Sequence, residues 1–245
     1  MISTIFHTIV YDPLYNALVF LVDTIPGHDV GLAIVILTIL VRLVVYPLSK
    51  RTIASQIAMK KITPEVEELK KKFKANSPEQ TQAVFALYKE RDVHPFAGLG
   101  LMLIQLPILI ALYWIFALGG LPVVDTHILY TFIPKPETVN MLFLGLIDMG
   151  AKHNILLALL TIVTQLAYSR LSMGPRVGKT AIEESLSSDM ARSFDMQARY
   201  VLPVVIGFVA YSVAAAAPLY YVTSNLFMIA QEYLAGRRFY DKKTQ

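Results

Sequence analysis

The sequence predicts an all-α, polytopic membrane protein, and its composition and its long charge-free stretches are the observations that predict it. The 245 residues are 55% hydrophobic and 16% charged, with a mean hydropathy of +0.53. Soluble domains carry about 25% charged residues, so this chain lacks the polar surface that a water-exposed globule needs. Cysteine is absent, which excludes disulfides, iron–sulfur clusters and thiolate zinc sites.

Five transmembrane helices are expected. They comprise residues 29–49, 95–118, 154–170, 199–214 and 216–235. The last two come from one charge-free stretch, Tyr200 to Ala230. As a single helix its 31 residues would measure roughly 46 Å, too long for a hydrocarbon core of about 30 Å. Pro218 lies near the middle of the stretch and disfavours a continuous helix, so we expect a tight hairpin of two short helices.

The first segment, residues 1–28, differs from a signal peptide because no Lys or Arg precedes Arg42. Polar residues are mixed with its apolar ones, and Pro26-Gly27 would end a helix. This pattern favours an external amphipathic helix that lies in the membrane interface. A short span over Leu14 to Val22 is the alternative.

The basic residues predict the orientation. Of the 22 Lys and Arg residues, 19 fall in the hairpin 50–94, the loop 171–198 with Arg170 and Arg199 on either side of it, and the tail 236–245. Only Lys135 and Lys152 fall on the other side, in the loop 119–153. The amino terminus is therefore expected outside and the carboxyl terminus in the cytoplasm.

The cytoplasmic segment 50–94 predicts a helical hairpin that turns at Ala75-Asn76. Thr63-Pro64-Glu65 and Ser77-Pro78-Glu79-Gln80 each have the residues that start a helix. Apolar residues recur at helical spacing at Val66, Leu69, Phe73, Val84, Leu87 and Tyr88. The basic face of the hairpin suits anionic lipid, ribosomal RNA or an acidic partner. A solvated face that only enforces topology explains the charge equally well.

Arg42 is the most informative residue. It lies eight positions before Lys50, roughly 12 Å from the cytoplasmic interface along a helix. A charge at mid-span costs about 2.5 to 3.5 kcal/mol on insertion scales. The side chain either snorkels to the headgroups or faces a hydrated cavity, and Thr38 one turn earlier favours the cavity.

Other expected spans carry polar groups that match Arg42. They are Gln105, Thr161, Thr164, Gln165, Tyr220, Tyr221, Thr223, Ser224 and Asn225. Singly, such residues are more often contacts between helices than sites. Together with Arg42 they indicate a hydrated, positively charged space, because from Val30 onward the spans hold no acid before Glu232.

Catalytic motifs are missing from the sequence. The five histidines are scattered over loops and ends without metal-ligand spacing. No Ser/His/Asp grouping, phosphate-binding loop or glycine-rich fingerprint is present. We therefore expect a protein that is not an enzyme and that needs no cofactor or metal.

Three blocks of sequence, in this order, resemble the YidC-type membrane protein insertases, in their short, five-span bacterial form. The first, Gly31 to Lys74, is similar to the family's first core span and cytoplasmic hairpin. The second, Ala86 to Phe116, is similar to its second span with a glutamine-proline pair. The third, Arg199 to Leu234, resembles its last two spans with their tyrosine-tyrosine and serine-asparagine pairs. His94-Pro95 and the run Ala214 to Pro218 depart from the family pattern.

The resemblance implies a bundle around a hydrophilic groove that is open to the cytoplasm and the lipid and closed to the outside. The family's groove residues would fall on Arg42, Thr38, Gln105, Gln165 and Tyr221, with Tyr220 beside them at the groove mouth. The family's substrate-receiving hairpin would fall on Ile53 to Arg91.

The function that follows is insertion and folding of nascent membrane proteins in the bacterial inner membrane. The expected partners are these substrates and the lipid bilayer; the ribosome and the Sec translocation channel would suit the hairpin and the basic tail, and DNA is not expected. Two alternatives stay open. One is a small channel or carrier for an anionic solute, and the other is a passive assembly scaffold.

Overall fold

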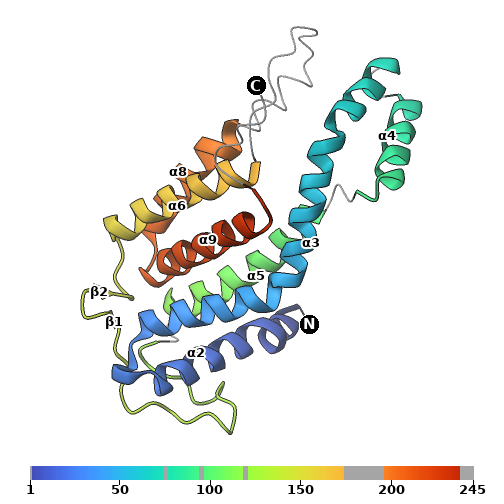
Figure 1. Ribbon diagram of the computed structural model, residues 1–245. Coiled ribbons are helices and arrows are strands. Elements are labelled where there is room, and N and C mark those ends of the chain that lie inside the picture. The colour runs from blue at the N-terminus through green and yellow to red at the C-terminus, as the bar shows by residue number, and fades with distance from the viewer. Residues whose placement is uncertain (1, 74–76, 94–96, 118–120, 174–195, 238–245) are drawn as a thin grey trace. The chain divides into compact units, whose positions relative to one another are not determined.

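The computed structural model describes residues 2–73, 77–93, 97–117, 121–173 and 196–237 (Figure 1). It divides into two compact units, Met1–Leu43 with Pro107–Gln245, and Val44–Leu106. The predicted turn at Ala75-Asn76, the His94-Pro95 junction and most of the loop 171–198 and the tail 236–245 lie outside the described residues.

The first unit is helical. It contains α1 (Ile2–Phe6), η1 (His7–Tyr11), α2 (Asp12–Thr24), η2 (Pro26–His28), the first part of α3 (Val30–Lys72), the last part of α5 (Ala97–Ala117), β1 (Leu142–Phe143), β2 (Ile147–Asp148), α6 (Ile155–Met173), η3 (Gln197–Val201), α8 (Leu202–Ser212) and α9 (Ala216–Leu234). The helix α2 ends at Thr24, just before Pro26-Gly27.

Three of the described helices are long and apolar enough to cross a membrane: Thr4–Thr24, Val30–Leu69 and Ile155–Met173. A shorter apolar helix covers Gln105–Phe116. Large apolar side chains are exposed on α6 and α8, among them Leu159, Val163, Val204, Phe208 and Val209. Exposed apolar faces of this kind suit contact with lipid. The prediction of an α-helical membrane protein is confirmed at this level.

The charge-free stretch near the end of the chain forms two helices. α8 ends at Ser212 and α9 begins at Ala216, with Val213 in an extended conformation between them. The turn is held by the chain before α6, because Ala215 N donates to Ala151 O at 2.9 Å and Ala216 N donates to Met149 O at 3.0 Å.

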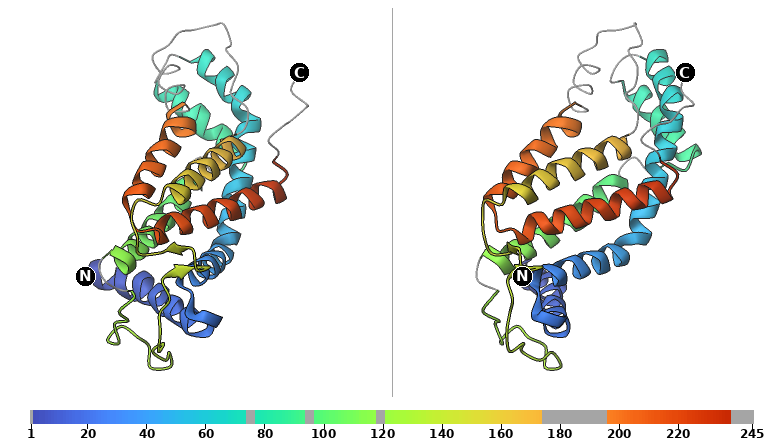
Figure 2. Two further views of the ribbon diagram at one scale, coloured as in Figure 1. Left: turned by 90° about the vertical axis from the view of Figure 1, so that its left-hand side faces the viewer. Right: turned by 60° about the vertical axis from the view of Figure 1, so that its left-hand side comes forward.

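The helix α6 packs closely against α8 and α9, which lie beside it (Figures 1 and 2). At Gly207 of α8, a Cβ atom would lie 2.1 Å from Cγ1 of Ile162 on α6. Only glycine fits at this contact, in keeping with the small residues that let helices approach closely in membranes.

Asn16 ties α2 to the connection between α5 and α6. The side chain is 1% exposed. Its Nδ2 donates to the carbonyl of Ile128 at 2.9 Å, and its Oδ1 accepts from the backbone N–H of Tyr130 at 2.7 Å. The connection is therefore a folded structure with buried polar anchors.

Asp29 makes a second anchor at the start of α3. One of its carboxylate oxygens accepts from Leu32 N at 3.0 Å and caps the helix, while the other accepts from Leu144 N at 2.7 Å in the β1–β2 hairpin. Gly31 lies directly beneath Phe143 of this hairpin, since a Cβ there would lie within 2.5 Å of that ring. These contacts close one end of the first unit.

The second unit contains the rest of α3, the helix α4 (Pro78–Glu90) and the first part of α5. The predicted helix start at Thr63-Pro64 is wrong, because α3 continues through both Pro47 and Pro64. It also crosses the boundary expected at residues 49 and 50. Thr63 Oγ1 donates to Met59 O at 3.1 Å within the helix and so does not act as a cap.

The hairpin core of the second unit is formed by four buried residues, Ile62, Val66, Leu87 and Val93. The partly buried residues around it include the predicted Leu69, Val84 and Tyr88. Phe73 is exposed and does not belong to this core. The predicted cap of α4 is confirmed, as Ser77 Oγ accepts from Gln80 N at 3.1 Å.

Candidate functional site

Arg42 is buried in the first unit, with 8% of its surface exposed. Its Nε donates to Ser224 Oγ of α9 at 2.8 Å, and its Nη2 donates to the same oxygen. The guanidinium therefore contacts a neighbouring helix, which argues against a side chain that simply snorkels to the headgroups. Ser224 supplies an oxygen but no charge.

Asn225, the next residue of α9, continues this polar region toward α6. The side chain is fully buried, and its Nδ2 donates to Thr164 Oγ1 at 3.2 Å. Within the described part of the chain, its Oδ1 has no hydrogen-bond partner, and neither has Nε2 of buried Gln231. Buried polar atoms are almost always paired, so these two atoms suit water or a polar ligand group.

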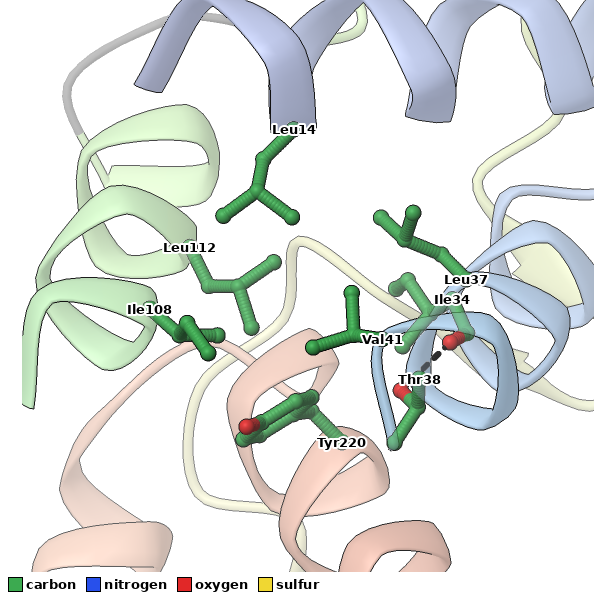
Figure 3. A pocket seen from close by; sticks show the side chains of 8 residues that line it. All are labelled: Leu14, Ile34, Leu37, Thr38, Val41, Ile108, Leu112 and Tyr220. Carbon is green, nitrogen blue, oxygen red and sulfur yellow. Dashed lines mark hydrogen bonds between the residues drawn. The ribbon is translucent and has the colours of Figure 1, made fainter. Parts of the chain in front are cut away.

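Thr38 and Tyr220 line a separate small pocket (Figure 3). The pocket has a volume of about 10 Å³, room for no more than one water molecule. Its other residues are the aliphatic Leu14, Ile34, Leu37, Val41, Ile108 and Leu112. The Thr38 hydroxyl donates to Ile34 O at 2.6 Å within its own helix. This part of the predicted site is therefore apolar.

The other predicted site residues are distributed as follows. Tyr220 is 3% exposed, so it packs inside the first unit and does not lie at an open mouth. Tyr221 and Gln165 are half-buried in the same unit, with Gln165 next to Thr164 in α6. Gln105 is half-buried in the second unit.

The residues that contact Arg42 and extend its polar region, namely Ser224, Asn225 and Thr164, were seen in the sequence only as general polar groups. A signal for Ser224 was available, because it follows Tyr220 by four residues and so lies on the same face of α9. Among the described residues there is no group of three or more side chains suited to hold a metal ion.

A second charged cluster lies where α6 and α9 end. Glu232 is 1% exposed, and its carboxylate accepts from Arg237 Nη1 at 3.1 Å, with its other oxygen 2.9 Å from the same nitrogen. Arg237 Nη1 also donates to Ser172 O at 2.7 Å, and Arg199 Nη2 donates to Met173 O at 3.4 Å. Two arginines thus bind the last carbonyls of α6, where the helix dipole favours cations.

Comparison with known proteins identifies the family. The model of the family described as 60Kd inner membrane protein matches residues 21–243. The chain is 32% identical over 219 residues to the membrane protein insertase YidC of Oceanobacillus iheyensis, covering 87% of this chain and 77% of the relative. It is 30% identical over 215 residues to that of Clostridium tetani, covering 87% of this chain and 84% of the relative.

A solved structure is also similar. It is described as an active YidC insertase crystal structure with the first transmembrane domain resolved, and it matches with a TM-score of 0.53 and 26% sequence identity. The match covers 91% of this chain but 46% of the solved chain, so this chain spans less than half of that protein. The resemblance found in the sequence is confirmed, and the chain belongs to the 60Kd inner membrane protein family, the family of the YidC membrane protein insertases.

Proposed function

We propose that this chain inserts nascent membrane proteins into the bacterial inner membrane, with Arg42 as the charged centre of a polar groove bordered by α3, α6 and α9. The observation that carries the proposal is the burial of Arg42 against Ser224, in a family of insertases. A buried arginine in a membrane helix is costly, so its presence argues for a functional role.

The groove would act by lowering the cost of moving a polar tail. An acidic or polar segment loses its hydration when it enters hydrocarbon. Near Arg42 it would gain a charge partner, and Asn225 Oδ1 offers a buried acceptor for a backbone N–H. The tail would thus cross half of the membrane while its polar groups stay satisfied.

The apolar helix of the substrate supplies the driving free energy. Its transfer to lipid is favourable by about 25 cal/mol per Å² of apolar surface removed from water. Half-buried Tyr221 and Gln165 are the site residues of the first unit that a passing helix would contact, while buried Thr38 and Tyr220 would support the groove wall. Gln105 of α5 would be a further residue that contacts the substrate. This mechanism needs no nucleotide or other cofactor.

The proposed topology has five transmembrane helices, an external amino terminus and a cytoplasmic carboxyl terminus. The α5–α6 connection, anchored through Asn16 and Asp29, would close the groove toward the outside. The hairpin of α3 and α4, with its basic surface, would receive substrates from the ribosome or the Sec channel.

The experiment that tests this function measures insertion of a single-span protein with a short acidic external tail. Liposomes would contain the wild type, Arg42→Gln or Arg42→Lys, and Arg170→Gln would serve as the matched control, because Arg170 is exposed at the end of α6. We expect Arg42→Gln to lower the insertion rate at least about tenfold, a factor that corresponds to about 1.4 kcal/mol. Arg42→Lys should retain most of the rate.

Other outcomes would favour the alternatives. If folded Arg42→Gln protein inserts the substrate as well as the wild type, Arg42 is structural and the scaffold function gains support. If the wild type inserts nothing but releases an anionic dye or solute from the liposomes, the buried arginine serves a channel or carrier.

A further inference from the structure

A cluster of buried polar groups, which we call the α9 clasp, is formed by Glu232, Arg237 and Ser172. Arg237 donates to the Glu232 carboxylate at 3.1 Å and to the Ser172 carbonyl at 2.7 Å. The Glu232 side chain is 1% exposed and that of Arg237 is 10% exposed. The acid is therefore held, out of water, by a cation that is itself fixed to the end of α6.

The clasp lies on the helix that contacts Arg42. Glu232 follows Ser224 by eight residues, about 12 Å along α9. Side chains on a helix lean toward its amino-terminal end, so the Glu232 carboxylate leans toward the Ser224 side. Charges at this separation interact when the space between them is shielded from water.

A buried carboxylate in this position would act against the proposed groove. If its charge were not compensated, it would attract the Arg42 guanidinium and repel an acidic segment of a substrate. Arg237 removes both effects, because the ion pair is neutral overall. The clasp would thus both join α6 to α9 and neutralise the negative charge of Glu232.

We propose that Arg237 is a positioning residue that neutralises Glu232 and thereby keeps the positive charge of Arg42 available to acidic segments of substrates. This inference rests on the proposed function of Arg42. It distinguishes Arg237 from a purely structural link, because its effect depends on the charge of the substrate.

The test compares two single-span substrates in liposomes, one with an acidic external tail and one in which Gln replaces each tail acid. The variants are Arg237→Gln, Glu232→Gln, both together, and Arg42→Gln, with Arg170→Gln as the control. Thermal unfolding in detergent shows which variants are folded. We expect Arg237→Gln to lower insertion of the acidic-tail substrate about tenfold and of the Gln-tail substrate less than about twofold. Adding Glu232→Gln should restore the acidic-tail substrate to within about twofold of the wild type.

Two results would overturn the inference. In the first, Arg237→Gln lowers insertion of both substrates equally and Glu232→Gln does not rescue it, as a structural link predicts. In the second, Arg237→Gln has no effect while Arg42→Gln still discriminates between the tails, so that only the clasp inference fails. If Arg42→Gln does not discriminate between the tails, the proposed function fails and this inference fails with it.

Discussion

The hydrogen bond from Arg42 Nε to Ser224 Oγ, 2.8 Å long, joins α3 to α9 across 182 positions of the chain. It fixes the direction of the guanidinium within the first unit. We therefore expect this single hydroxyl to contribute measurably to the proposed site.

Replacing Ser224 with alanine removes this hydroxyl and leaves the arginine in place. Hydrogen bonds between transmembrane helices contribute about 1 kcal/mol, so we expect Ser224→Ala to lower the free energy of unfolding by that amount. Insertion of an acidic-tail substrate should fall less than in Arg42→Gln. Ser212→Ala is the control, because the Ser212 hydroxyl is exposed and bonds only within α8 in the described contacts. Equal destabilisation by both changes would contradict the prediction.

Because Gly207 packs closely against Ile162, a larger residue at position 207 is expected to destabilise the packing of α8 on α6. A Cβ at Gly207 would overlap the Ile162 side chain, so Gly207→Ala must displace that side chain or move α8 away from α6. Overpacking of this kind costs about 1–3 kcal/mol. Thermal unfolding in detergent should show the loss, and adding Ile162→Ala should recover part of it. Gly150→Ala provides the control, since a Cβ there meets its neighbours at an ordinary 3.4 Å.

The hydrogen bonds of Asn16 are expected to stabilise the connection between α5 and α6. In Asn16→Ala the backbone N–H of Tyr130 and the carbonyl of Ile128 lose their partner, and because both bonds are part-buried we expect the free energy of unfolding to fall by about 1 kcal/mol. Hydrogen exchange over residues 121–133 should accelerate, while exchange in α6 should stay slow. The exposed His127 offers a control through His127→Ala. Unchanged exchange in Asn16→Ala would show that the connection is held without this anchor.

A substitution at Leu87 tests whether the hairpin core stabilises the second unit. It is 8% exposed and packs in a cluster of four buried residues, so Leu87→Ala should lower the local stability by at least about 2 kcal/mol. Hydrogen exchange in α4 should report the change. Phe85→Ala on the same helix should have a small effect, because Phe85 is 51% exposed. Similar exchange in the two variants would mean that the cluster does not stabilise α4.

The features that were predicted correctly follow from signals within short stretches of sequence. The break between α8 and α9 follows from the length of a charge-free run relative to a bilayer, and the Ser77 cap follows from a four-residue motif. Pro64 shows the limit of such signals. A proline preceded by threonine and followed by glutamate is typical of a helix start, yet α3 continues through it.

The site was harder to predict, because its contacts depend on which helix faces meet. Arg42 is visible in the sequence as a charge in an apolar helix. That Ser224 contacts it, while Tyr220 one turn earlier packs against aliphatic side chains, depends on which turns of α9 and α3 lie opposite each other. Asn16 is another example, since its partner Ile128 lies 112 positions away.

The two arginines at the end of α6 have a mechanical consequence. Arg199 precedes α8 and Arg237 follows α9, and both donate to backbone carbonyls in the last turn of α6. Sliding any one of these three helices past the others would break at least one of these bonds. The three helices are therefore expected to move as a rigid body, and the proposed groove would widen for a substrate by a hinge motion between this body and the first part of α3.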